Sequence, residues 1–203
     1  MSLSDSQSRL FLEPLKGKTT AFRLDDRPSN LKFAAAIFRV LAATRRGCRL
    51  LDLDAFYSSN LEALAAGLPR ESLGGFDITL PEPGSDMETT LAALFLEGDD
   101  RPLLIDSANS LYQLLSPRSS RAASMKFTFF VAALSNWAKS NGKPAMASIY
   151  DRRPATHRRA SRSLADVFDN AVSLSAGPDG LAFKCERGSA WRGGGFFLPL
   201  EHR

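Results

Sequence analysis

The chain has 203 residues and is 44% hydrophobic, which is typical of a globular protein with one domain and a sizeable core. No apolar stretch reaches the ~20 residues of a membrane-spanning helix, and residues 1–18 lack the basic and apolar regions of a signal peptide. We therefore expect no membrane contact and a cytoplasmic location, or a nuclear one in a eukaryote. The formal net charge of +4 is mildly basic and gives weak support to an anionic partner.

The cysteines argue against a disulfide-stabilised or metal-binding protein, and the charged residues are unevenly distributed along the chain. Cys48 and Cys185 have no His or Cys nearby at metal-ligand spacing, so we expect neither a disulfide framework nor a metal site, and two small buried side chains. Basic residues outnumber acidic ones in residues 118–143 and 152–162, whereas acidic residues dominate residues 82–100. No Ser/His/Asp or Cys/His arrangement stands out, and we predict no catalytic residues.

The N-terminal part of the chain predicts a strand followed by a helix. Residues 1–18 are polar and mixed, and we interpret them as a loose tail or a short lead-in. Residues 19–24 predict a strand, and Pro28 and Ser29 indicate a turn after it. Ser29 or Asn30 is the predicted N-cap of the following helix. That helix places four apolar side chains on one face: Phe33, Ile37, Val40 and Leu41.

Strands and helices then alternate along the chain. Four short runs predict strands: residues 48–53, 76–80, 101–106 and 144–150. Helices are predicted at residues 61–66, 86–97 and 126–140, with a loop or short helix at 107–115 and a mobile loop at 116–124. The helix at 126–140 carries a stripe that we assign to the core: Phe127, Phe130, Leu134 and Trp137.

The C-terminal quarter has a different pattern. Residues 151–163 form a polar loop with five arginines, and residues 164–170 read as a short helix or turn. Three short strands separated by glycine-rich turns follow, at 170–175, 181–186 and 195–200. We predict an α/β fold with a doubly wound, mainly parallel sheet flanked by helices and a closing antiparallel meander. Residues 19–203 then form a single core domain, with 1–18 as the tail or lead-in.

The turn between the first strand and helix lies where a phosphate-binding loop would lie, but its chemistry is missing. Such a loop requires G-x-x-x-x-G-K-[ST], so that bare backbone N–H groups close round the phosphates. In the register DRPSNLKF only Lys32 fits. Asp26 and Leu31 replace the glycines, and Phe33 replaces the hydroxyl that would hold Mg²⁺.

In order and spacing, residues 15–200 resemble the core of the RecA/RadA/KaiC superfamily. CRLLDLDAFYSSNLEAL (48–64) resembles the second recombinase strand with its acidic pair, and RPLLIDSANSLY (101–112) resembles a Walker B strand. Residues 116–149 resemble the first DNA-binding loop of such proteins with its helix and the next strand, and residues 151–163 fall where the second DNA-binding loop lies. The resemblance implies a RecA-like core whose Walker A motif is degenerate.

The resemblance also assigns a degenerate nucleotide site to Lys32, Asp54 and Asp106. In an active member Asp106 would hold Mg²⁺ through water, and Asp54 stands where recombinases carry the glutamate that polarises the attacking water. Because the phosphate cradle is missing, we expect a pseudo-ATPase without a cofactor. The two aspartates would then serve as strand-end carboxylates that cap loops or meet a basic neighbour.

Two basic segments form the strongest functional pattern. Clustered guanidinium groups suit phosphate backbones, and the fold would place both segments at one sheet edge. The candidate nucleic-acid contacts are Arg118, Arg121, Lys126, Arg152, Arg153, Arg158, Arg159 and Arg162. Tyr150 is the nearest aromatic residue to the arginine loop, so stacking on bases has little support. A solvated charged loop or an acidic protein partner is the alternative.

These observations favour a non-catalytic RecA-like recombinase paralogue in DNA recombination or repair. We expect it to bind DNA, with single strands favoured, or RNA, and to associate with a RecA-like partner or with itself. One alternative is a structural subunit of a RecA-like ring in tRNA modification, as in Elongator. Another is an ATPase with an unorthodox phosphate site.

Overall fold

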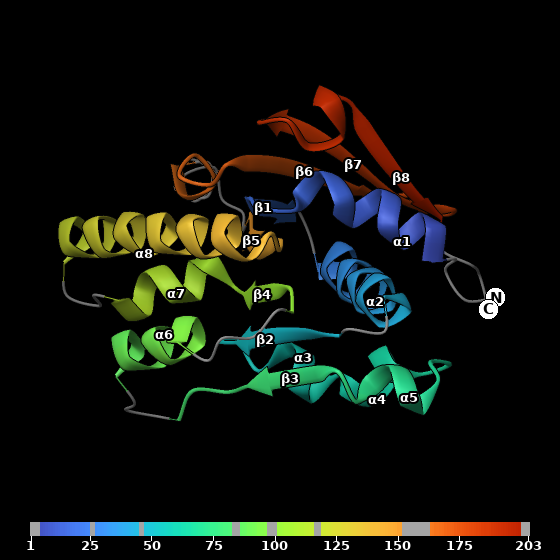
Figure 1. Cartoon of the computed structure of the whole chain (residues 1–203), viewed down its shortest axis with the longest axis horizontal. Helices are drawn as coiled ribbons and strands as arrows, with labels where there is room; N and C mark the ends of the chain where they lie inside the picture. Colours follow the sequence, from blue (N-terminus) through green and yellow to red (C-terminus); the bar gives the residue numbers. More distant parts are fainter. Residues whose placement is uncertain are drawn as a thin grey trace.

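Eight strands form one sheet in a computed structural model that describes residues 5–24, 27–44, 47–82, 86–96, 101–115, 119–151 and 163–199. Their spatial order is β3-β2-β4-β5-β1-β6-β7-β8 (Figure 1). The strands are β1 (Thr19–Leu24), β2 (Cys48–Asp52), β3 (Phe76–Thr79), β4 (Leu103–Asp106), β5 (Ala145–Tyr150), β6 (Asn170–Ala176), β7 (Gly180–Arg187) and β8 (Gly195–Pro199).

Helices cover both faces of this sheet (Figure 1). On one face are α1 (Asp5–Leu12), η1 (Glu13–Leu15), α2 (Arg27–Ala43), α3 (Phe56–Ser59), α4 (Leu61–Ala65) and α5 (Arg70–Leu73). On the other are α6 (Met87–Leu96), α7 (Ala108–Leu115) and α8 (Ser120–Asn141). A short helical turn, η2 (Ala190–Gly193), lies between β7 and β8.

The sheet is parallel over six strands and antiparallel over the last two. β1 lies between β5 and β6 and runs parallel to both, with Phe22 opposite Ser148 and Val172. β7 and β8 close the sheet in antiparallel pairing. The predicted mainly parallel α/β sheet is therefore confirmed, but the antiparallel part begins one strand later than the predicted meander, because β6 pairs with β1.

Buried helix faces match the apolar spacing of the sequence. Phe33, Ile37, Val40 and Leu41 of α2 are each at most 1% exposed, as the three- and four-residue spacing predicts. The α8 stripe of Phe127, Phe130, Leu134 and Trp137 is at most 9% exposed, which confirms its assignment to the core. The helices thus form one apolar layer on each face of the sheet, and these two layers hold the strands and their ends in place.

The starts of α2 and α8 differ from the predictions. The helix α2 begins at Arg27, so Ser29 and Asn30 lie inside it and neither is its N-cap. Pro28 is tolerated there because the first turn of a helix leaves its N–H groups without helical partners in any case. The predicted mobile loop at 116–124 was wrong from Ser120 onward, where α8 begins, and its residues 116–118 lie outside the described part.

Residues 5–15 belong to the apolar layer beside α2. Phe11 and Leu15 are fully buried, and the Phe11 ring contacts Trp191 at 5.4 Å between centroids. Trp191 also packs on Phe183, so this aromatic side chain lies against the same apolar layer. Of the two free cysteines, Cys48 is buried as expected, whereas Cys185 is only partly covered.

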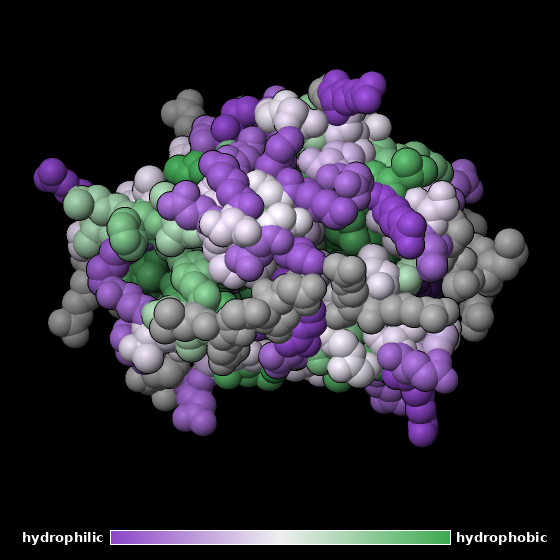
Figure 2. Space-filling model, in the orientation of Figure 1, coloured by the Kyte–Doolittle hydropathy of each residue, from purple (hydrophilic) through white to green (hydrophobic). Residues whose placement is uncertain are grey.

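The surface facing the viewer is largely polar, with a group of apolar residues over α7 and α8 at its left (Figure 2). Among the described residues, no helix combines the length and the apolar character required to cross a lipid bilayer.

Candidate functional site

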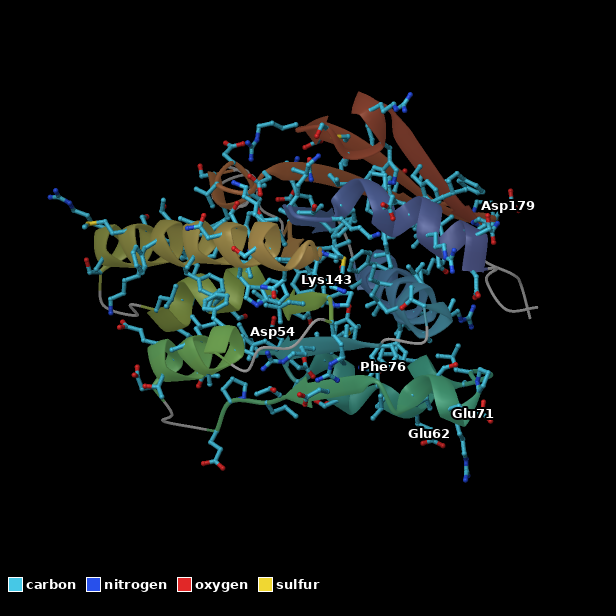
Figure 3. All side chains as sticks on the ribbon, viewed as in Figure 1. Asp54, Glu62, Glu71, Phe76, Lys143 and Asp179 are labelled. Carbon is cyan, nitrogen blue, oxygen red and sulfur yellow. The ribbon has the colours of Figure 1, made fainter. Side chains whose placement is uncertain are left out.

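The carboxyl ends of the parallel strands meet at one edge of the sheet, where open α/β folds place their ligand sites. At this edge β2 ends in Asp52 and β4 ends in Asp106, and the two residues are register partners. Asp54 follows β2 and lies beside the start of α7 (Figure 3). Asp54 and Asp106, two of the three residues assigned to the degenerate nucleotide site, therefore both lie at this edge.

Hydroxyl and backbone groups hold two of these aspartates. Asp52 accepts hydrogen bonds from the backbone N–H groups of Phe56, at 2.9 Å, and of Ser58, at 2.7 Å, and so fixes the turn into α3. Asp54 accepts from the hydroxyls of Ser107, at 2.8 Å, and of Ser110, at 2.5 Å. Each carboxylate thus joins its strand end to the helix that follows β2 or β4.

Asp106 has the most unusual environment of the three. It is fully buried, and its Oδ1 accepts hydrogen bonds from the hydroxyls of Ser148 and Tyr150 on β5. Its second oxygen, Oδ2, has no hydrogen-bond partner among the described residues. Burial raises the pKa of Asp106 to about 6, with Asp54 and Asp52 adding to the rise and the two hydroxyls opposing it.

Lys32 does not join the aspartates. Its Nζ donates to the backbone carbonyl of Gly177, at 3.1 Å, in the turn between β6 and β7. The strands β5 and β1 separate β6 from β4 in the sheet. The structure therefore brings Asp54 and Asp106 together and places Lys32 at a different part of the edge.

The residue that follows Lys32 belongs to the core. Phe33 is 1% exposed, and its ring contacts the rings of Phe22, at 5.1 Å, and Phe183, at 6.5 Å. A serine or threonine in this position would have supplied a hydroxyl to a metal ion, whereas phenylalanine supplies an apolar contact to the sheet. In the described part of the chain no group of three or more His, Cys, Asp or Glu side chains could hold a metal ion.

Most of the predicted nucleic-acid contacts cannot be placed. Arg118, Arg152, Arg153, Arg158, Arg159 and Arg162 lie outside the described residues. Arg121 is exposed in the first turn of α8, and Lys126 forms an ion pair with Glu88 of α6, at 2.5 Å. Tyr150 bonds to Asp106 and is partly buried, so it is not available as a stacking platform.

The sequence prediction did not include an ion cluster at the carboxyl end of β5, in which two members are buried and the third, Glu186, is exposed. Arg23 of β1 donates to Asp151, at 2.6 Å, and to Glu186 of β7, at 2.5 Å. Arg23 and Asp151 are 7% and 5% exposed. Burial alone would lower the pKa of Arg23, but the hydrogen bonds and charges of Asp151 and Glu186 raise it, so the guanidinium stays charged. In the sequence, the one indication of this cluster is the single arginine, Arg23, in the otherwise uncharged strand TTAFRL.

A cavity of about 610 Å³ lies at the opposite edge of the sheet. Its lining includes Arg9, Lys16 and Lys143, the last of them labelled in Figure 3, together with Asp5 and Glu13. Lys16 is already paired with Glu13, at 2.6 Å. Because the charges nearly cancel, this cavity favours no class of ligand.

Comparison with known proteins settles the fold. No protein-family model matches the chain, and no curated protein matches it. Among solved structures, the RadB recombinase is similar, with a TM-score of 0.66 and 16% sequence identity over 92% of this chain and 89% of that chain. The fold is RecA-like. With 16% sequence identity, the similarity extends to the fold alone. The activity of this chain therefore has to be inferred from its own residues.

Proposed function

We propose that this RecA-like protein acts in DNA recombination or repair by binding nucleic acid and a protein partner, without hydrolysing ATP. The proposal depends on two residues at the start of α2, Lys32 and Phe33, which lie where a phosphate-binding loop would have its lysine and its hydroxyl. Phe33 is part of the core, and Lys32 is bound to the carbonyl of Gly177. Both residues stabilise the fold where a RecA-like ATPase needs groups free to meet phosphate and Mg²⁺.

The aspartates support the same proposal. Asp54 is held by two serine hydroxyls, and Asp106 is buried against Ser148 and Tyr150. A water-polarising or Mg²⁺-binding carboxylate must present lone pairs to a ligand site. Here the hydrogen bonds of these side chains fix strand ends and helix starts, which is the role of structural carboxylates.

The nucleic-acid part of the proposal depends on the loop that follows β5. Residues 152–162 hold Arg152, Arg153, Arg158, Arg159 and Arg162, and in the chain they come directly after Asp151, at the carboxyl end of β5. The ion cluster of Arg23, Asp151 and Glu186 ties Asp151, the residue just before this segment, to β1 and β7. Arginine-rich segments bind phosphate backbones through charge-assisted hydrogen bonds.

Fluorescence anisotropy with labelled single-stranded DNA across a KCl series tests this part. Replacing Arg152, Arg153, Arg158 and Arg159 with alanine is expected to weaken binding and flatten the salt dependence. Each phosphate contact on a single strand contributes about 0.7 to the slope of log K against log salt, so the slope should fall by up to about 3. A matched control replaces four exposed basic residues elsewhere: Arg9, Arg70, Lys139 and Lys184.

The control variant has the same net charge as the loop variant, so it separates a local contact from a general charge effect. Equal losses in the two variants would contradict a binding site in the loop. A parallel series with tRNA distinguishes the ring-subunit alternative, because tighter and steeper binding of tRNA than of DNA would favour RNA modification. Absence of binding to both polymers would contradict the nucleic-acid part altogether.

A further inference from the structure

The strand β7 contains a β-bulge where it pairs with β6. Arg187 lies opposite Ala171 in this pairing. The next pair joins Cys185 to Val172, so Glu186 is an extra residue in β7. In a regular strand the side chains of two consecutive residues point to opposite faces of the sheet. A bulge changes the direction of one of them, so that two consecutive side chains can reach the same face.

The first residue of this bulge, Glu186, acts on the residue that precedes the arginine-rich segment 152–162. It forms an ion pair with Arg23 of β1, at 2.5 Å, and Arg23 also bonds to Asp151, at 2.6 Å. Arg23 points to the face of the sheet that α8 covers, because the residues on either side of it belong to the apolar layer of the other face. Through Arg23, Glu186 therefore helps to hold Asp151, which directly precedes the first arginine of the segment.

The second residue of the bulge, Arg187, holds the chain on the other side of the segment. Its Nη2 donates to the backbone carbonyl of Ala165, at 3.0 Å, and to that of Phe168. The side chains of Ala165 and Phe168 belong to the apolar layer on the α8 face, so Arg187 reaches the same face as Glu186. The bulge thus lets two consecutive residues of β7 hold the chain before and after the arginine-rich segment.

We propose that the β7 bulge, formed by Glu186 and Arg187, positions the arginine-rich segment for nucleic-acid binding by holding the chain on both sides of it. The proposal rests on the function proposed above, in which that segment binds nucleic acid. A segment whose two ends are held loses less conformational freedom on binding, and therefore binds more tightly. In this role Glu186 and Arg187 are positioning residues, and neither contacts the phosphates.

For the variant Glu186→Gln, positioning and general electrostatics predict opposite changes in affinity. The variant makes the chain more positive, so a general charge effect would tighten the binding of single-stranded DNA. Loss of the ion pair should instead weaken binding by about 2- to 10-fold, because more of the chain has to be ordered on binding. Glu62→Gln on α4 is the matched control, since it changes the charge equally at an exposed carboxylate and should not weaken binding. Arg23 keeps its bond to Asp151 in Glu186→Gln, so this variant should fold.

The variant Arg187→Gln separates positioning from a phosphate contact. It should weaken binding about 2- to 10-fold and leave the slope of log K against log salt unchanged, whereas the loss of a phosphate contact would lower that slope by about 0.7. Arg70→Gln on α5 is the matched control, because it removes the same charge from an exposed position. Asp169 accepts hydrogen bonds from the N–H and the hydroxyl of Thr19, both at 2.9 Å. These bonds attach the start of β6 to β1 without Arg187, so Arg187→Gln should fold.

Limited digestion with trypsin measures the attachment of the segment in the absence of nucleic acid. Trypsin cleaves after arginine, and mass spectrometry of the fragments locates the cuts within residues 152–162. Glu186→Gln and Arg187→Gln should each be cut there about 2- to 10-fold faster than the Arg70→Gln control, because the rate of proteolysis follows the population of locally open chain. Urea unfolding of the same variants checks that the whole chain is still folded.

The combined results decide between the outcomes. Weaker DNA binding at an unchanged salt slope, with faster cleavage in both variants, would support the proposal. Tighter binding by Glu186→Gln, a slope lower by about 0.7 in Arg187→Gln, or cleavage at the control rate would overturn it. If only the four-arginine variant loses DNA binding, the bulge has no positioning role although the proposed function stands. A wild type that binds neither DNA nor tRNA would overturn both.

Discussion

At the scale of single residues, Asp106 shows how the environment of a side chain depends on partners that are distant in the sequence. The sequence places it correctly at the end of a strand, but the sequence does not contain its partners. Ser148 and Tyr150 come from β5, 42 and 44 residues later in the chain. Such a buried carboxyl, with a pKa of about 6, makes stability depend on pH.

Replacing Asp106 with asparagine is expected to change this pH dependence. The pKa of Asp106 in the folded chain, about 6, lies above the ~3.9 of an unfolded aspartate, so the folded state holds the proton more tightly. Relative to Asp106→Asn, the wild type should therefore lose about 2–3 kcal/mol of stability as the pH rises from about 4 to about 6, and nothing further above that. Urea unfolding of both chains at several pH values measures the difference.

The matched control is Glu62→Gln on α4, where the carboxylate is exposed. Its stability difference from the wild type should change little over the same pH range. A wild-type to Asp106→Asn difference that is constant from pH 4 to pH 7 would show that Asp106 is not proton-linked to folding.

The cluster of Arg23, Asp151 and Glu186 illustrates what a sequence cannot reveal at this scale. Arg23 lies 128 residues from Asp151 and 163 from Glu186. An arginine in an apolar strand indicates that a partner exists, because a buried charge is rarely left unpaired. Only the sheet order, with β5 and β6 on either side of β1 and β7 next to β6, identifies the partners.

At the scale of elements, helix starts are harder to predict than strands. The buried parallel strands were found because they appear as short apolar runs bounded by polar residues. The start of α8 was missed because SPRSSRAAS has the small polar composition of a loop. The helix begins there because the Ser119 hydroxyl accepts a hydrogen bond from the N–H of Ala122, at 3.3 Å, and Ala123 is buried.

This N-cap gives a stability prediction. Ser119→Ala should destabilise the chain by about 1 kcal/mol, since the N–H of Ala122 loses its acceptor at the start of a 22-residue helix. Ser120→Ala is the control, because Ser120 is an exposed residue one position later and alanine favours the helix. Urea unfolding compares the two, and equal stabilities would contradict the assigned cap.

Two glycines with positive φ lie at the boundaries of helices and strands. Gly142 ends α8 at a φ of 62°, and its N–H bonds to the carbonyl of Lys139, at 3.3 Å. Gly47 precedes β2 at a φ of 66°, and a Cβ there would lie 2.0 Å from the carbonyl oxygen of Gly75. A glycine after a helical segment favours a helix end, but the close approach of Gly75 to Gly47 depends on the pairing of β2 with β3.

At the scale of the whole molecule, the fold is RecA-like, and the start of α2 contributes Phe33 to the core. The alternation of strands and helices predicted this frame. It was harder to predict which surface binds which partner. Lys126, for example, was predicted to contact nucleic acid, but it forms an ion pair with Glu88 beside an apolar groove. The composition of a segment shows that it is charged. The contact between α6 and α8 determines which side chain pairs with Lys126, and it cannot be read from that composition.

This arrangement predicts that the intact chain does not bind nucleotide as RecA-like ATPases do. Micromolar, Mg²⁺-dependent binding of a fluorescent ATP analogue should be absent, because Phe33 offers no hydroxyl and Lys32 is engaged by Gly177. Lys32→Ala should give the same signal as the wild type in equilibrium titrations with and without Mg²⁺. Binding that requires both Mg²⁺ and Lys32 would mean that Lys32 leaves Gly177 to meet phosphate. The proposal of a non-hydrolysing protein would then give way to that of an ATPase with an unorthodox phosphate site.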